Sequence, residues 1–130
     1  MIVVDASAIL EVLLNSRAAA RAAERLFAPG ETLHAPHLLD VEVAQVLRRY
    51  AASGELDDAR GGRALEALAE FALTRYPHQP FLPRMWALRH TLTAYDAAYV
   101  ALAEALGAPL VTRDVRLASA AGHAAEIELV

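Results

Sequence analysis

The sequence predicts an α/β fold in which helices cover both faces of a central parallel sheet of four or five strands. Short apolar runs rich in β-branched residues alternate with stretches of helical periodicity, which is typical of parallel strands joined by crossover helices. The 130 residues, 56% of them hydrophobic, are enough to bury one core. We therefore expect residues 1–130 to form one domain with three layers, α/β/α.

In the first half of the chain, the short apolar runs Met1–Val4 and Thr32–Ala35 predict strands. The helices expected there from apolar spacing are Ala6–Asn15, Ala18–Phe27, His37–Ala52 and one from Asp57 and Asp58 to about Leu73. Turn residues at Pro29-Gly30 and Ser53-Gly54 separate these elements. Pro36 has the fixed φ of a first helical turn, so we expect it to begin the helix that follows.

In the second half, Arg75–Pro83 holds three prolines and is expected to be irregular, with a short strand near Thr74–Tyr76. Gly107 is the expected stop of a strongly helical stretch. The helices predicted here are Met85–Thr91, Thr93–Leu106 and Val115–Ala121. Pro109–Thr112 predicts a further strand, and the alternating Glu126–Leu129 an edge strand.

Four acidic residues occupy positions that such a fold would bring together. Asp5 and Asp114 each follow a predicted strand and precede a helix, which places them at the carboxyl edge of the sheet, where ligands bind in open α/β folds. Glu42 and Asp96 lie in predicted helices. Mg²⁺ and Mn²⁺ are held by carboxylates and keep positions open for substrate phosphate. The pattern indicates a metal site and predicts phosphodiester hydrolysis.

Each of these carboxylates also has a purely structural interpretation. Asp5 and Asp114 are well placed as N-caps, and Asp96 completes a capping box with Thr93. Glu42 lies at the shoulder of the apolar face of its helix, where a charge needs a partner, either Arg49 or a metal. Because a cap keeps its carboxylate ionised, capping and metal binding are compatible, and the prediction depends on the combination.

Composition narrows the classes of protein. A net charge of −4 argues against binding nucleic acid through bulk positive charge, although an acidic cluster contributes to that count. The absence of cysteine excludes thiolate metal sites and fits a reducing cytoplasm. The chain begins with MIVV, without a basic leader, and no apolar stretch is long enough to span a membrane, so we expect a cytoplasmic protein. It also lacks a P-loop, a dinucleotide fingerprint and a serine-nucleophile motif.

Other polar side chains have weaker signals. The arginines that would either contact a phosphate backbone or lie on a solvated surface are Arg84, Arg89, Arg113 and Arg116. His34 and His37 have a spacing seen in some metal sites, but the intervening strand-to-helix junction favours coincidence. Tyr95 and Tyr99 share one helical face and are predicted to lie in the core or an interface rather than to stack on bases.

Taken together, the four segments resemble the PIN-domain ribonucleases, in particular the VapC-like toxins of bacterial and archaeal toxin-antitoxin pairs. That family has a first strand ending in Asp, a small residue and Ser or Thr, as in VVDAS here, and a helical E-x-x-N-x-L segment. The stretch YDAAYVALAE is close to its third motif, and Thr112-Arg113-Asp114 matches its final T-x-D. The resemblance runs from Ile2 to Leu117, and it departs at Gln45, where the family commonly has Asn.

The resemblance implies a single PIN domain whose acidic cluster is Asp5, Glu42, Asp96 and Asp114. Ser7 and Thr112 would supply hydroxyl groups beside the cluster, and Gln45 a supporting amide. The implied activity is endoribonuclease cleavage with Mg²⁺ or Mn²⁺, in which the metal activates a water and stabilises the leaving oxygen. The implied partners are RNA, a VapB-like antitoxin that inhibits the enzyme, and a second copy in a homodimer. The alternative is a noncatalytic PIN-like adaptor that keeps the acidic cluster but acts by binding protein.

Overall fold

Five parallel strands form the centre of the molecule, in the order β3-β2-β1-β4-β5. The computed structural model describes residues 1–130. The strands are β1 (Ile2–Val4), β2 (Leu33–Pro36), β3 (Leu73–Tyr76), β4 (Leu110–Thr112) and β5 (Ile127–Leu129). β1 pairs with both β2 and β4, so the residues that follow these strands meet at one edge of the sheet.

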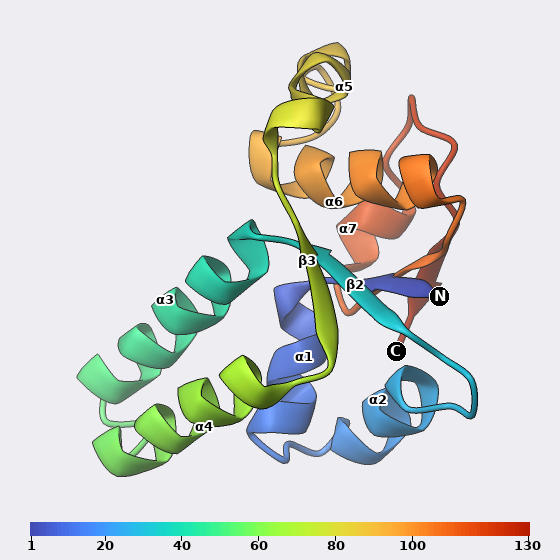
Figure 1. Ribbon diagram of the computed structural model, residues 1–130. Coiled ribbons are helices and arrows are strands. Elements are labelled where there is room, and N and C mark those ends of the chain that lie inside the picture. The colour runs from blue at the N-terminus through green and yellow to red at the C-terminus, as the bar shows by residue number, and fades with distance from the viewer.

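Helices cover both faces of this sheet, as predicted (Figure 1). α5 (Leu82–Ala87) and α6 (Ala94–Leu106) lie on one side, and α1 (Ala6–Leu13) and α2 (Ala19–Leu26) lie on the other. α3 (Leu38–Ala52) and α4 (Asp58–Glu70) pack together as an arm that projects beside the sheet, and the short α7 (Val115–Ala118) contacts β5. None of the helices combines the length and apolar character needed to cross a membrane.

The core forms where β1 meets α6. All of β1 is fully buried, and α6 is buried from Ala97 to Ala103, which fits its contacts with β1, β2 and β4. Four of those seven α6 residues are alanines, whose small side chains allow the helix axis to approach the strands closely. Thr93 caps the helix, and Gly107 ends it in the left-handed conformation at φ 60°. Asp96, in the first turn, is thereby fixed beside the sheet edge.

Two predictions around prolines are wrong in whole or in part. Pro36 lies in β2, paired with Tyr76, and does not begin a helix. It lies beyond the last residue pair of β2 with β1, so its missing N–H costs no bond to that strand. The short strand predicted near Thr74–Tyr76 is present as β3, but the rest of Arg75–Pro83 is not irregular, because the 3₁₀ turn η1 (Gln79–Phe81) and the start of α5 occupy most of it. Pro80 and Pro83 occupy the first turns of those two elements, where proline needs no N–H partner.

Four helices are shorter than predicted or shifted. The predicted Met85–Thr91 helix begins earlier, at Leu82, and ends at Ala87. α1 stops at Leu13, and Asn15 has a positive φ of 47° that no helix continues through. α4 ends three residues before Leu73, which starts β3, and α7 ends at Ala118 rather than at Ala121. The other predicted elements agree with the structure to within one residue at each end.

An ion-pair network joins the edge strand β5 to the helix before β2. Arg25 of α2 donates from Nε to Glu128 at 2.6 Å and from its guanidinium to Glu31, also at 2.6 Å. The amino-terminal ammonium contacts Glu31 as well. These two cations lower the pKa of Glu31 from 4.5 to about 2. The network ties both ends of the chain to one arginine.

Replacing Glu31→Gln should lower the free energy of unfolding at pH 7 by about 1 kcal/mol, the scale of a partly exposed ion pair. Because the folded-state pKa is lowered, the ionised carboxylate stabilises the protein above pH 4.5 and loses that effect as the pH falls towards 2. Urea unfolding of both proteins at several pH values measures the difference, and Glu24→Gln, an exposed change on α2, is the control. A difference that stayed constant down to pH 2 would contradict the assignment.

Candidate active site

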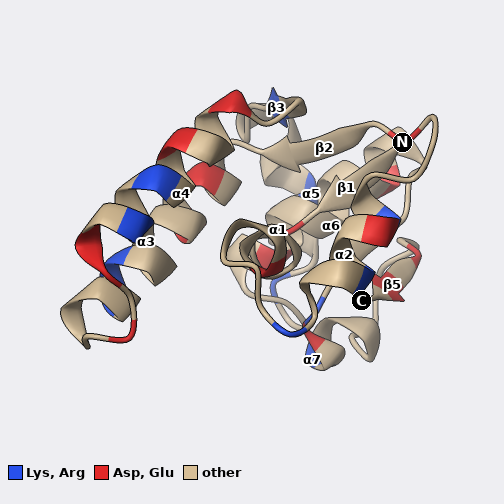
Figure 2. Ribbon diagram, turned by 90° about the horizontal axis from the view of Figure 1, so that it is seen from below, with Lys and Arg blue, Asp and Glu red and all other residues tan.

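A cavity of about 690 Å³ opens at the carboxyl edge of the sheet, between α1, α3 and the first turn of α6. Its wall includes all four predicted carboxylates together with Ser7 and Gln45. Thr112 is fully buried and donates its hydroxyl to the Asp5 carboxylate. On α3 the acidic residues lie near the start and the arginines near the end, and on α4 the arginines lie between acidic residues, so neither helix forms a continuous basic stripe (Figure 2). The local arginines, not a bulk charge, are therefore the cationic groups of this cavity.

Asp5 is the buried carboxylate of the site, with 9% of its surface exposed. Its Oδ1 accepts from Ser7 Oγ at 2.6 Å and from the Ala8 amide at 3.1 Å, which makes it the N-cap of α1. Its Oδ2 accepts from the Thr112 hydroxyl. Burial raises the pKa of Asp5, while the bonds from Ser7 and Thr112 oppose that rise. The capping interpretation is correct, and the same carboxylate also lines the cavity.

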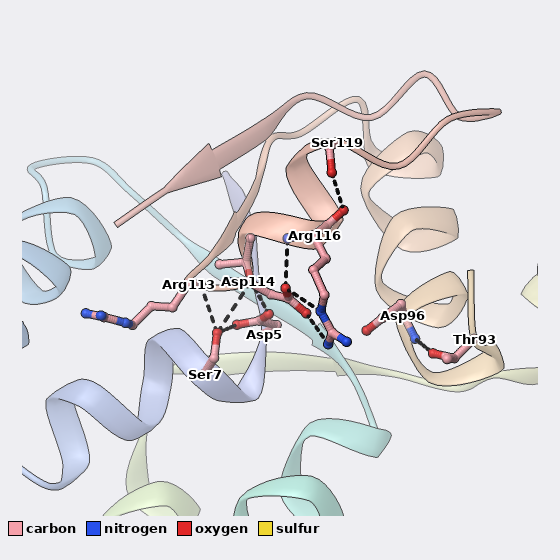
Figure 3. Close-up of polar contacts among 9 residues, drawn as sticks. Asp5, Ser7, Thr93, Asp96, Arg113, Asp114, Arg116 and Ser119 are labelled. Carbon is pink, nitrogen blue, oxygen red and sulfur yellow. Dashed lines mark hydrogen bonds and ion pairs between the residues drawn. The ribbon is translucent and has the colours of Figure 1, made fainter. Parts of the chain in front are cut away.

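Hydroxyl groups link the two corners of the sheet edge (Figure 3). Thr112 Oγ1 accepts the Asp114 amide at 3.0 Å, and Ser7 Oγ accepts the Arg113 amide at 2.9 Å. The loop after β1 and the loop after β4 are thus fixed to each other through side chains that also bind Asp5. Of the three residues predicted to support the cluster, Ser7 and Thr112 both bond to Asp5 directly.

Glu42 of α3 is bonded by a tyrosine from the other side of the cavity. Tyr99 donates its hydroxyl to Glu42 Oε1 at 2.6 Å, across 57 residues of sequence. Burial raises the pKa of Glu42, and the charges of Asp5 and Asp96 raise it further. Arg49, one of the two partners expected for Glu42, does not pair with it and lies instead over the ring of Tyr50. Tyr99 is in the core as predicted, but its phenol also holds Glu42 in place.

Asp96 and Asp114 face each other from α6 and α7. The Asp96 amide bonds to Thr93 Oγ1 at 3.2 Å, which is half of the predicted capping box. Burial, with the charge of Asp114, raises the pKa of Asp96. Asp114 caps α7 by accepting the Arg116 amide, and the Arg116 guanidinium binds both of its carboxylate oxygens and lowers its pKa. Both acids thus take part in the predicted capping contacts and also line the cavity.

The donor set suits a hard divalent cation. All four predicted ligands offer carboxylate oxygens, and three of them, Asp5, Glu42 and Asp96, have pKa values raised chiefly by burial. A cation in the cavity would stabilise the ionised form of these buried carboxylates. As the side chains stand, however, no group of three or more His, Cys, Asp or Glu residues could hold a metal ion. The four acids share one cavity, and ligation by more than two of them would require side chains to rotate.

The structure places several of the other polar residues that the sequence singled out. His34 uses its two ring nitrogens for hydrogen bonds to Thr32 and Tyr76, and its role is therefore structural in this conformation. Arg84 pairs with Glu104, away from the cavity. Tyr95 was predicted to lie in the core or an interface. It does not lie in the core, because 62% of its surface is exposed and it lines the cavity, and its place in an interface stays a prediction.

Three contacts escaped sequence analysis. These are the pairs Tyr99–Glu42, Arg116–Asp114 and Arg113–Glu11. Only the second had a local signal, since a D-x-R sequence after a strand lets the arginine reach the capping carboxylate. The other two join separate elements, so spacing along the chain carried no sign of them.

Comparison with known proteins agrees with this geometry. The sequence profile of the PIN domain matches residues 2–123. The chain belongs to the PIN-domain family. It is 51% identical to VapC ribonuclease Mb0985 of Mycobacterium bovis over 90% of this chain and 88% of that protein. It is 47% identical to ribonuclease VapC12 of Mycobacterium tuberculosis, over 100% and 99% of the two chains.

The PIN fold is also found in solved structures. A toxin-antitoxin complex from Klebsiella pneumoniae superposes with a TM-score of 0.68 and 22% identity, covering 92% of this chain and 91% of that one. At that identity the likeness concerns the fold. The family resemblance inferred from the four sequence motifs is confirmed.

The substitution Glu42→Gln should raise the melting temperature in EDTA at pH 7. The neutral amide removes a partly buried charge that repels Asp5 and Asp96, yet its oxygen still accepts the Tyr99 hydroxyl. Because the pKa of Glu42 is raised in the folded protein, the stability of the wild type relative to the variant should fall as the pH rises past 4.5. Thermal unfolding from pH 4 to pH 8 checks this, with Glu55→Gln on the exposed α3–α4 turn as the control. Equal or lower stability of Glu42→Gln at pH 7 would rule out like-charge strain.

Proposed function

We propose that this protein is a metal-dependent endoribonuclease, the toxin of a type II toxin-antitoxin pair, and that residues 1–130 act as one PIN domain. The observation that carries the proposal is the gathering of Asp5, Glu42, Asp96 and Asp114 in one cavity of a PIN-domain chain. The chain is 51% and 47% identical to two VapC ribonucleases over 90% and 100% of its length, which supports RNA cleavage as the reaction. The raised pKa values of three of the acids weigh against the adaptor alternative, which has no need of strained carboxylates.

The carboxylates would act as ligands and positioners of water. We assign Asp5 and Asp96 to direct coordination of Mg²⁺ or Mn²⁺, and Glu42 and Asp114 to coordination directly or through water. When bound, the metal supplies Lewis-acid polarisation of the phosphate and a lowered pKa of water. Ser7 and Thr112 fix the Asp5 carboxylate by donating to it, so one rotamer faces the cavity. Tyr99 binds Glu42 Oε1 and leaves Oε2 without a partner in the chain, available to orient a water.

Gln45 is the weakest member of the proposed site. Its side chain is exposed, lines the cavity and forms no hydrogen bond within the chain. Its amide is therefore free to bind a water or a phosphate oxygen on the face of α3 that carries Glu42. The supporting role assigned to Gln45 stays a prediction.

The proposed partners follow from the family. RNA would enter the cavity, where Arg113 and Arg116 line the wall beside the acids. The same cavity continues along α3 past Leu38, Val41, Val46 and Tyr50, an apolar wall suited to a segment of a VapB-like antitoxin. We also propose a homodimer. The RNA that is cut would be identified by sequencing RNA ends after brief expression of the protein.

Either Asp5→Asn or Asp96→Asn should reduce RNA cleavage by more than about 100-fold, because each removes a ligand charge while hardly changing shape. Cleavage should also stop in excess EDTA and return with Mg²⁺ or Mn²⁺. The measurement is the cleavage rate of total cellular RNA by purified protein, with circular dichroism to verify folding. Asp58→Asn, an exposed change in the first turn of α4, is the matched control. Full activity of either site variant, or of the wild type in EDTA, would refute the proposed function.

A further inference from the structure

A guanidinium already occupies the space between two of the proposed metal ligands. Arg116 Nε donates to Asp114 Oδ1 at 3.2 Å, and its terminal nitrogen donates to Oδ2 at 3.0 Å. Figure 3 shows this guanidinium between the carboxylates of Asp114 and Asp96. The positive charge acts on both acids, because it lowers the pKa of Asp114 and opposes part of the rise that burial and the Asp114 charge cause in the pKa of Asp96. Arg116 therefore stands where a cation shared by the two acids would lie.

The ion pair between Arg116 and Asp114 is weak. Its side chain is 86% exposed, and Asp114 is the only group to which the side chain bonds. Exposed ion pairs are weak, since water screens both charges and a long side chain must be immobilised. A divalent cation brings twice the charge and needs no side-chain ordering. The contact is thus strong enough to balance the acids in the absence of metal but weak enough to be replaced.

The neighbouring arginines are arranged differently. Arg113, also in the cavity wall, pairs with Glu11, which is not a proposed ligand. Arg49 lies over Tyr50 and forms no ion pair. Arg116 alone among the arginines lining the cavity binds a carboxylate of the proposed metal site. Its position is therefore specific and is not a general property of basic residues here.

We propose that Arg116 is an internal counterion of the metal-free site, which a divalent cation displaces from Asp114. The displaced guanidinium then lies at the rim of the cavity, where its planar fork can bind a phosphate of the RNA. Arg116 is in this sense a positioning residue that holds Asp114 until the metal arrives and a substrate contact afterwards. The inference rests on the proposed metal-dependent function.

Mn²⁺ binding measured by electron paramagnetic resonance, without RNA, tests the displacement. Removing the competitor in Arg116→Gln should tighten the Kd for Mn²⁺ by about 3-fold, the ratio expected from a surface ion pair. Arg49→Gln removes the same charge from the same cavity without freeing a carboxylate, and it should change the Kd clearly less. In an Asp114→Asn background, Arg116→Gln should have no more effect than Arg49→Gln.

RNA cleavage supplies the second measurement. Arg116→Gln should raise KM for RNA several-fold at saturating Mn²⁺, with a smaller effect on kcat, so metal affinity and substrate affinity change in opposite directions. A residue that merely stabilised α7 would not produce that opposition.

The outcomes separate this inference from the proposed function. Equal tightening in Arg116→Gln and Arg49→Gln, or weaker Mn²⁺ binding in Arg116→Gln, would overturn the counterion role while leaving a metal-dependent enzyme. An unchanged KM would overturn the substrate contact. If the wild type bound no Mn²⁺ at all, the proposed metal-dependent function would fall first, and the inference with it.

Discussion

The burial of one carboxylate at the end of the central strand sets the requirements for the rest of this site. Asp5 follows β1, which lies in the middle of the sheet, and only 9% of its surface is exposed. An ionised group there needs donors, and they come from two corners of the fold, Ser7 on α1 and Thr112 on β4. The parallel pairing of β1 with β4 is what brings these corners together. The register of the sheet therefore determines the geometry of the acidic cavity around Asp5.

The remaining acids are delivered by helices whose packing leaves them little freedom. α6 approaches the strands through its small buried residues and so carries Asp96 to the sheet edge, while Tyr99 from the same helix reaches across to Glu42. Burial raises the pKa of Asp5, Glu42 and Asp96, and repulsion from neighbouring carboxylates adds to the rise at Glu42 and Asp96. Such an arrangement opposes stability, and proteins tolerate it where function depends on it. Arg116 offsets part of the charge at the outer rim, beside Asp114.

Sequence analysis predicted most of the fold because its signals are local. Asp5, Thr93, Asp114 and Gly107 each satisfy backbone groups within a few residues, so their positions fixed helix ends to within one residue. Prolines were misinterpreted where tertiary context decides: Pro36 extends a strand because β3 pairs with it. The four acids were predicted to meet, and they line one cavity. The Tyr99–Glu42 bond depends on the fold placing α6 and α3 at the same cavity, which no local pattern encodes.

The proposed function depends on one property of this cavity, which is that it binds a divalent cation through Asp5 and Asp96. Crystals of the protein soaked in Mn²⁺, with anomalous diffraction recorded above the manganese edge, test it most directly. The account predicts an anomalous peak within coordination distance of Asp5 and Asp96, with the Asp114 carboxylate no longer bound to Arg116. A map with no peak in the cavity, or with Mn²⁺ bound only at unrelated surface carboxylates, would contradict it.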